Sequence, residues 1–155
     1  MELHEIISSE RILRLDNFQG DKSELLKLIF EKCDKISSFK EKRRDEIWET
    51  LIERENSMST GIGLGVAIPH CSTEYVDDVI AMLAVMKDGI DFQAIDDVPV
   101  QIIVLLLLPK NKFEKHIKTL ASVARLFNNE EFRSRILNAE NSEEIYAILQ
   151  GITPQ

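Results

Sequence analysis

The segment Val100–Leu108 places the strongest constraint on how this chain can fold. Its core, Ile102–Leu108, is a continuous apolar run of seven residues with β-branched residues at its start, and Pro109 follows it. Such a run is far shorter than the ~20 residues needed to span a bilayer. It is typical of a strand that is buried on both faces of a sheet. The sequence therefore predicts a sheet with helices on each side.

The segments on both sides of this strand carry helical periodicity in their apolar residues. Helices are predicted over residues 21–33, 40–55, 113–128, 130–138 and 143–150. Asp21 and Asn129 are expected N-cap residues, because a short polar side chain can accept a hydrogen bond from the first helical turn. A loop is predicted over residues 36–38, between the first two helices.

The remaining apolar segments predict further strands. Extended segments are expected over residues 12–15, 66–68 and 79–86, with Gly89 ending the last of them. No internal repeat or linker divides the chain, so residues 1–155 are expected to form a single domain. The predicted fold is α/β: a three-layer sandwich in which a small mixed β-sheet has helices on both faces.

Charge and cysteine content restrict the class of protein. The formal net charge is −8, and no basic cluster is present, which argues against nucleic-acid binding. Cys33 and Cys71 form no C-x-x-C motif and are expected to stay reduced. The first residues lack a basic segment and a long apolar run, so we expect a cytoplasmic protein without direct membrane insertion.

The stretch Arg54–His70, RENSMSTGIGLGVAIPH, contains glycines at three alternate positions before a short strand. It lacks the spacing G-x-G-x-x-G and the Lys-Ser/Thr pair of a P-loop, and both of those motifs precede helices. A tight bend beside a packed strand is therefore favoured over a nucleotide-binding loop. A small-ligand module resting on this loop alone is the least favoured function. Pro69 is expected to end the strand, which places His70 at its mouth.

Three side chains could carry chemistry together: His70, His116 and Arg54. A neutral imidazole can accept a phosphoryl group, and a guanidinium binds phosphate oxygens in a bidentate manner. A second histidine could orient the first or donate to the phosphoryl oxygens. Taken singly, each has a structural explanation: a satisfied histidine, a half-exposed helix histidine and a cation at a helix C-terminus. Transfer between histidines needs no cofactor and no metal ion.

A metal site formed by His70, Cys71 and His116 is the competing hypothesis. Neighbouring residues on a strand point to opposite faces, so adjacent His-Cys ligands chelate poorly. Phosphoryl transfer is therefore favoured.

The motifs STGIG-x-G-x-AIPH, ID-F-x-AID-x-x-PV and LLLLP follow one another in this chain. In these motifs the sequence resembles the IIA domain of the fructose/mannitol class of the bacterial phosphotransferase system, a group that includes nitrogen-regulatory IIA proteins. The resemblance extends from Leu3 to the last predicted helix. It implies an α/β fold with a mixed sheet between helical layers.

The resemblance also implies site residues and partners. The histidine of the IPH motif corresponds to His70, which would take a phosphoryl group from HPr, or a nitrogen-type HPr, and pass it to a cysteine of a IIB domain. The arginine of the R-E segment matches Arg54, and the second histidine matches His116. The alternative is a regulatory interaction protein in which the phosphorylation state of His70 controls binding to a transporter, kinase or transcription regulator.

This chain departs from the family pattern at four positions. Cys71 and Ser72 stand where a glycine and often a basic residue follow the IPH motif. Leu64 replaces a frequent asparagine, and Asp97 replaces a frequent glycine. Loss of the glycine is expected to alter the shape of the loop after His70, and loss of the basic residue to change the partner or slow transfer.

Overall fold

A computed structural model describes residues 2–37, 39 and 43–151 of the chain. Two short 3-10 helices precede the first strand, at Leu3–Glu5 and Ser9–Arg11. The strands are β1 (Ile12–Arg14), β2 (Gly61–Gly63), β3 (Val66–Ala67), β4 (His70–Thr73), β5 (Ile80–Ile90) and β6 (Val100–Pro109). The helices are α1 (Lys22–Ser37), α2 (Arg44–Ser57), α3 (Phe113–Phe127), α4 (Glu130–Asn138) and α5 (Ser142–Leu149).

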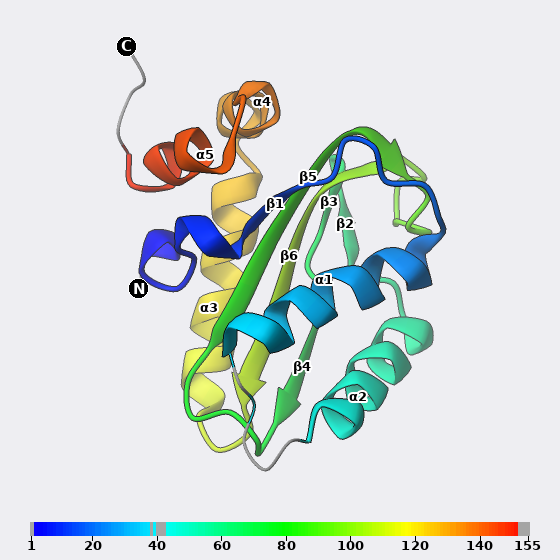
Figure 1. Cartoon of the computed structure of the whole chain (residues 1–155), viewed down its shortest axis with the longest axis vertical. Coiled ribbons are helices and arrows are strands. Elements are labelled where there is room, and N and C mark those ends of the chain that lie inside the picture. Colours follow the sequence, from blue (N-terminus) through cyan, green and yellow to red (C-terminus); the bar gives the residue numbers. More distant parts are fainter. Residues whose placement is uncertain (1, 38, 40–42, 152–155) are drawn as a thin grey trace.

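The six strands form one mixed sheet in the order β1-β5-β6-β3-β2, with β4 also paired to β6 (Figure 1). The long strands β5 and β6 are antiparallel and occupy its centre. Three short strands run parallel to their neighbours: β1 to β5, and both β3 and β4 to β6. Strand β6 therefore has two successive partners along one edge, and the second of them begins with His70.

Helices cover both faces of this sheet, as the apolar run in β6 predicted. Successive side chains of a strand point to opposite faces. Ile102, Val104 and Leu106 pack in a core that includes α3, α4 and α5, whereas Ile103 and Leu105 pack in a second core with α1 and α2. Fully burying each aliphatic side chain contributes about 1.5–3 kcal/mol. The α/β sandwich prediction is confirmed.

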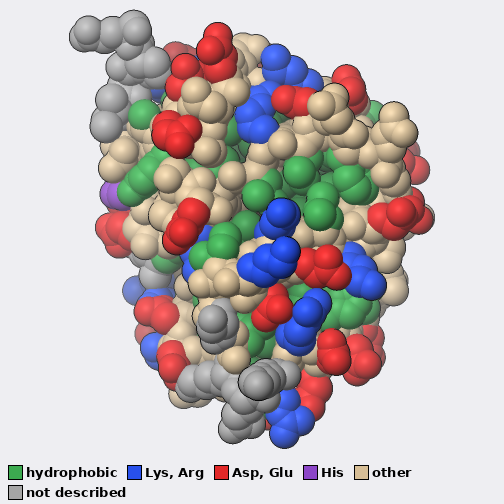
Figure 2. All heavy atoms as spheres, viewed as in Figure 1, with side chains coloured by type: hydrophobic (Ala, Val, Ile, Leu, Met, Phe, Trp, Pro, Cys, Tyr) green, Lys and Arg blue, Asp and Glu red, His purple; other side chains and the backbone are tan. Residues whose placement is uncertain are grey.

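The outer surface is charged and mixed in sign. On the face that carries α1, Lys and Arg side chains are interspersed with Asp and Glu, with small apolar areas between them (Figure 2). None of the helices in the described ranges is long and apolar enough to cross a membrane.

Polar side chains start the helices where the sequence indicated. Asp21 accepts a hydrogen bond from the Glu24 backbone N–H at 2.9 Å, and Glu24 accepts one from the Asp21 N–H at 3.3 Å, which is a capping box. Asn129 accepts from the Phe132 N–H, and α4 has the predicted bounds. The last helix begins at Ser142 rather than at residue 143, with Asn141 as its N-cap.

The predicted loop over residues 36–38 was wrong in part. Helix α1 continues through Ile36 to Ser37, because Ile36 packs against the core on the α1 side. Ser38 and residues 40–42 lie outside the described residues, and helix α2 is described from Arg44 onwards.

The glycine-spaced segment is a hairpin rather than a loop. Strand β2 pairs antiparallel with β3, and Leu64 and Gly65 form the turn between them, with φ of 62° and 79°. Gly89 does not end β5. The strand passes through it at φ 73°, with a shift of register, and continues to Ile90.

Candidate functional site

His70 is fixed by the backbone of β4. Pro69, which has no N–H to donate, separates β3 from β4, so His70 begins a new strand rather than following the end of the old one. Its partner across the ladder is Leu106 of β6, whose N–H donates to the Pro69 carbonyl at 2.9 Å. The prediction that the strand ends at Pro69 is confirmed, but His70 does not lie free at its mouth, because its own backbone is paired in β4.

The imidazole of His70 has a defined tautomer. Its Nδ1 lies 2.7 Å from the carbonyl oxygen of Ile68. A carbonyl oxygen only accepts hydrogen bonds, so Nδ1 carries the proton. In the neutral ring Nε2 then carries the lone pair, which makes it the atom able to attack an electrophile.

The surroundings of His70 favour this neutral form. Burial, the largest effect, lowers the pKa of His70 below its usual 6.5, and the positive charge of Arg54 lowers it further. The Ile68 carbonyl and the Glu55 carboxylate act in the opposite direction and raise the pKa of His70, but the burial effect exceeds theirs. His70 is therefore neutral at pH 7, as a nitrogen nucleophile must be.

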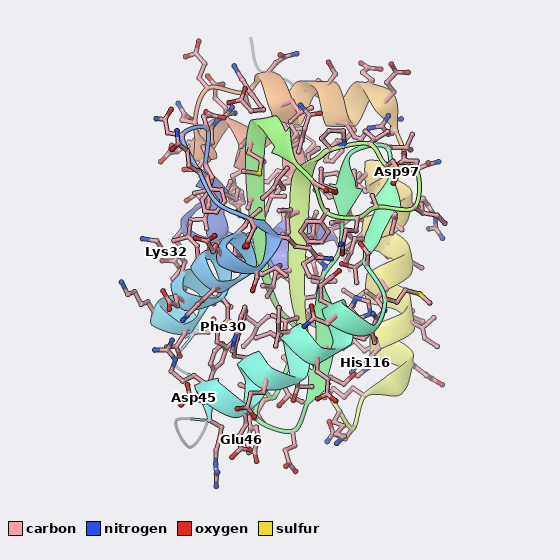
Figure 3. The ribbon with its side chains drawn as sticks, turned by 90° about the vertical axis from the view of Figure 1, so that its right-hand side faces the viewer. Phe30, Lys32, Asp45, Glu46, Asp97 and His116 are labelled. Carbon is pink, nitrogen blue, oxygen red and sulfur yellow. The ribbon has the colours of Figure 1, made fainter. Side chains whose placement is uncertain are left out.

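His116 lies close to the same strand but is buried. Its side chain belongs to α3 and the residue is only 8% exposed, so the prediction of a half-exposed helix histidine was wrong. Its Nδ1 lies 3.2 Å from the Ser72 hydroxyl oxygen, and its Nε2 contacts the Pro109 carbonyl. Figure 3 shows His116 in the lower half of the view, well separated from Asp97 in the upper half.

Arg54 lies in the last turn of α2. Its Nη1 donates to the carbonyl of Met58, the residue that follows the helix, at 3.0 Å. This contact matches the expectation of a cation at a helix C-terminus. The same guanidinium acts electrostatically on His70, which places Arg54 near the site. The structure thus brings all three predicted residues, from α2, β4 and α3, to one region.

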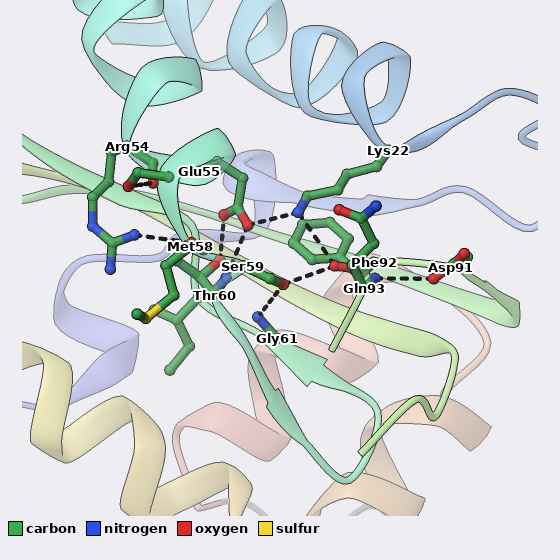
Figure 4. Close-up of polar contacts among 12 residues, drawn as sticks. Lys22, Arg54, Glu55, Met58, Ser59, Thr60, Gly61, Asp91, Phe92 and Gln93 are labelled. Carbon is green, nitrogen blue, oxygen red and sulfur yellow. Dashed lines mark hydrogen bonds and ion pairs between the residues drawn. The ribbon is translucent and has the colours of Figure 1, made fainter. Parts of the chain in front are cut away.

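A buried ion pair that sequence reasoning missed supports this region (Figure 4). Glu55 is 1% exposed, and its Oε2 lies 2.8 Å from Nζ of Lys22. Lys22 is the first residue of α1. Its carboxylate also accepts from the Thr60 N–H at 2.8 Å and from the Thr60 hydroxyl. Lys22 donates in turn to the Phe92 carbonyl at 3.2 Å. Two helices and the start of the hairpin are thereby joined immediately beside Arg54.

Cys71 points away from His70. The burial pattern of β4 alternates, and the Cys71 side chain lies in the core on the α1 and α2 side. Burial raises the pKa of the Cys71 thiol to about 12, which keeps it protonated at neutral pH. Within the described part of the chain, no group of three His, Cys, Asp or Glu side chains is arranged to hold a metal ion.

Close packing explains the glycines of the hairpin. A Cβ on Gly61 would come within 2.7 Å of the Ala94 Cβ and 2.9 Å of its Cα. The Leu64 N–H donates to Asp96 at 2.9 Å, so this part of the turn is already bonded within the protein. The hairpin is the tight bend beside a packed strand that the sequence favoured.

Comparison with known protein families gives a match over residues 5–151. The matching family is described as "Phosphoenolpyruvate-dependent sugar phosphotransferase system, EIIA 2". A fructose-specific EIIA component from Haloferax volcanii is 34% identical over 109 residues, covering 70% of this chain and 71% of that protein. A nitrogen regulatory protein from Bradyrhizobium diazoefficiens is 28% identical over 149 residues, covering 96% of this chain and 95% of that protein.

Solved structures agree with these sequence matches. The nitrogen regulatory protein IIA-Ntr from Neisseria meningitidis has a TM-score of 0.83 and 29% identity, covering 94% of this chain and 97% of that one. The Escherichia coli mannitol enzyme IIA, solved in complex with phosphorylated IIB, has a TM-score of 0.76 at 20% identity. It covers 94% of this chain and 97% of that one, and it shows the shared fold.

Proposed function

The chain belongs to the EIIA type 2 family of the phosphoenolpyruvate-dependent sugar phosphotransferase system, and on this premise we propose that it is a phosphocarrier whose acceptor is Nε2 of His70. One observation carries the proposal: the hydrogen bond from Nδ1 to the Ile68 carbonyl, at 2.7 Å. It leaves Nε2 as the nucleophilic nitrogen, and burial keeps the ring neutral by lowering the pKa of His70. We also propose that residues 1–155 act as one domain.

The reaction is a direct transfer between two histidines. The Nε2 lone pair of His70 attacks the phosphorus atom of a donor phosphohistidine while the donor's P–N bond breaks. The donor imidazole leaves with the electron pair of that bond, and a new P–N bond forms on His70. The N–H at Nδ1 of His70 keeps its hydrogen bond to the Ile68 carbonyl. This hydrogen bond stabilises the positive charge that develops on the ring.

Charge neutralisation is assigned to Arg54. Catalysis of phosphoryl transfer depends mainly on positioning and on offsetting negative charge on the transferred oxygens. The Arg54 guanidinium, held at the C-terminal end of α2, is a planar donor suited to phosphoryl oxygens. His116, close to the same strand, contributes by orienting groups around His70. In this role the chain is a phosphotransferase with a phosphohistidine intermediate.

The proposed donor is HPr or a nitrogen-type HPr, and the proposed recipient is a cysteine of a IIB domain. A solved relative in complex with phosphorylated IIB supports the second partner. The alternative output is regulatory, with the phosphorylation state of His70 controlling binding to a target protein. Two nitrogen regulatory relatives, whose matches cover 96% and 94% of this chain, favour keeping this alternative.

Phosphate transfer from labelled phosphoenolpyruvate, with enzyme I and HPr-type carriers supplied, tests the acceptor. Wild-type protein should carry an acid-labile, base-stable label, and His70→Gln should carry none. His116→Gln should still be labelled, although more slowly. Equal labelling of His70→Gln and wild type would refute the assignment of His70, and loss of label in His116→Gln alone would reverse the two roles.

The fate of the phosphoryl group on His70 distinguishes the transport role from the regulatory role. A phosphorylated chain that passes its label to a cysteine of a IIB domain is a transport component. A chain that holds its label in the presence of IIB domains, but binds a target protein in only one phosphorylation state, is regulatory.

A further inference from the structure

Ser72 occupies the same face of β4 as His70. Side chains two residues apart on a strand lie side by side, and the burial pattern of β4 follows this alternation. The strand is fixed at both ends, because the Leu106 N–H donates to Pro69 and the Lys110 N–H donates to the Thr73 carbonyl at 3.0 Å. The Ser72 hydroxyl is therefore held beside the acceptor histidine by the sheet itself.

The hydrogen bonds of His116 define the direction of the Ser72 hydroxyl. Because the Pro109 carbonyl can only accept, the contact with His116 requires a proton on Nε2. In the neutral ring Nδ1 then carries a lone pair, so the Ser72 hydroxyl, 3.2 Å away, is the donor. Neither ring nitrogen of His116 is left to contact a phosphoryl group on His70.

We propose that the Ser72 hydroxyl, rather than His116, contacts the phosphoryl group on His70, and that His116 acts through this hydroxyl. The proposal rests on the phosphocarrier function proposed above. Nδ1 of His70 faces back along the chain to Ile68, so the opposite edge of its ring faces the direction in which Ser72 follows. Rotation about the Cβ–Oγ bond of Ser72 then turns its O–H from Nδ1 of His116 toward a phosphoryl oxygen. The proton stays on the Ser72 oxygen, and only its hydrogen-bond acceptor changes.

Because His116 is buried, turning the Ser72 hydroxyl toward the phosphoryl group also affects His116. Once the hydroxyl turns to the phosphoryl group, Nδ1 of His116 loses its donor in a position where the residue is only 8% exposed. An unpaired buried acceptor is unfavourable. The hydroxyl therefore returns to His116 once the phosphoryl group has left, so His116 sets the resting position of Ser72. No covalent bond forms or breaks in this step.

The test combines a spectroscopic and a kinetic measurement on the full chain. The ¹⁵N resonances of His116 are recorded before and after phosphorylation of His70 in wild type, Ser72→Ala and Ser72→Thr. The rate of phosphoryl acceptance is measured for the same proteins. Ser122→Ala, an exposed serine on the same helix as His116, is the matched control.

The Nδ1 resonance of His116 should move on phosphorylation in wild type, Ser72→Thr and Ser122→Ala, but not in Ser72→Ala, where the donor is already absent. Acceptance should slow about fivefold in Ser72→Ala, the equivalent of one neutral hydrogen bond, and should recover in Ser72→Thr. A merely structural serine would not transmit phosphorylation to the Nδ1 resonance.

Two contrary outcomes are distinguishable. If Ser72→Ala is labelled at the wild-type rate and its His116 resonance moves as in wild type, Ser72 has no such role, and the phosphocarrier function stands. If wild type itself takes no label from any HPr-type carrier, both proposals fall together.

Discussion

Leu64 holds a backbone conformation that its side chain disfavours. Its φ is 62°, in the left-handed region, and its side chain is 52% exposed at the turn of the β2–β3 hairpin. This is a position where the family often has asparagine, and Asp97, at φ 59°, stands where the family often has glycine. Glycine and asparagine adopt this conformation more readily than leucine. Of these two departures, Leu64 is therefore the site of local strain, because aspartate, like asparagine, tolerates this conformation better than leucine does.

Replacing Leu64 with asparagine should stabilise the protein by about 0.5–1 kcal/mol, because the strain is relieved and little apolar burial is lost. Urea unfolding should show a higher midpoint with an unchanged slope. Ile62→Asn is the matched control: Ile62 is 46% exposed one position inside β2, has no positive φ, and should lose stability. A lower midpoint for Leu64→Asn would show that the leucine side chain stabilises the turn.

The depressed pKa of His70 has a kinetic consequence. Only the neutral ring can accept a phosphoryl group, so the acid limb of the pH–rate profile should lie below the usual 6.5. Because the charge of Arg54 contributes to the depression, Arg54→Gln should shift that limb to higher pH as well as slow the reaction. Single-turnover acceptance between about pH 5 and 8 measures both effects. Both proteins are measured with the same phosphorylated donor, so the pH dependence of the donor is the same in the two profiles. An acid limb at the same pH in Arg54→Gln and wild type would contradict the prediction.

The positions of the three candidate residues in the fold were predictable, because each is associated with a signal in the sequence: the end of a helix, a proline after a strand, and an apolar helix face. Their contacts were not. The burial of His116 and its bond to Ser72 depend on how β4 lies against β6, a pairing between segments distant in sequence. Lys22 likewise meets Glu55 only when α1 and α2 pack on the sheet.

At the scale of elements, the Lys22–Glu55 pair joins α1, α2 and the hairpin (Figure 4). Removing one partner of a buried ion pair leaves the other uncompensated, which typically costs about 3–5 kcal/mol. Lys22→Ala should therefore be strongly destabilising, because it leaves the fully buried Glu55 carboxylate without its cation. Glu55→Ala should also be destabilising, because it leaves the Lys22 ammonium, which is 16% exposed, and the Thr60 N–H without their partner. Glu53→Ala, an exposed carboxylate on the same helix, should change stability by less than about 0.5 kcal/mol.

Chemical denaturation of the three variants measures this difference. Similar midpoints for Glu55→Ala and Glu53→Ala would show that the ion pair contributes nothing net to the fold.

The elements themselves were predicted unevenly. Helix α4 and strand β6 follow strong local patterns, and their positions in the structure match. The bend and β3 were predicted, but strand β2 was missed, because it is built on Gly61 and Gly63. Glycine has low strand propensity, and Gly61 is required here by close packing against Ala94. Helix α1 was predicted too short, because Ile36 gains its packing partners only from the folded core.

At the scale of the whole molecule, stability is concentrated where β5 and β6 are covered on both faces. Amide hydrogen exchange should be slowest in β6 and in residues 81–85 of β5, where opening requires global unfolding. The β2–β3 hairpin, at one edge of the sheet, should exchange through local opening at a lower free energy. Equal protection in the hairpin and in β6 would indicate that the sheet opens only as a unit.

The pairing of β4 with β6 also bears on how the protein is made. Strand β4 leaves the ribosome before β5, β6 and α3 have been synthesised, yet its pairing partner is β6, and its Ser72 contact lies on α3. A nascent chain that displays His70 without these later segments has no strand to hold the histidine in place. With His70 as the proposed acceptor, phosphoryl acceptance requires β6 and α3 to have been synthesised and docked, so a labelled molecule should be folded at least through α3.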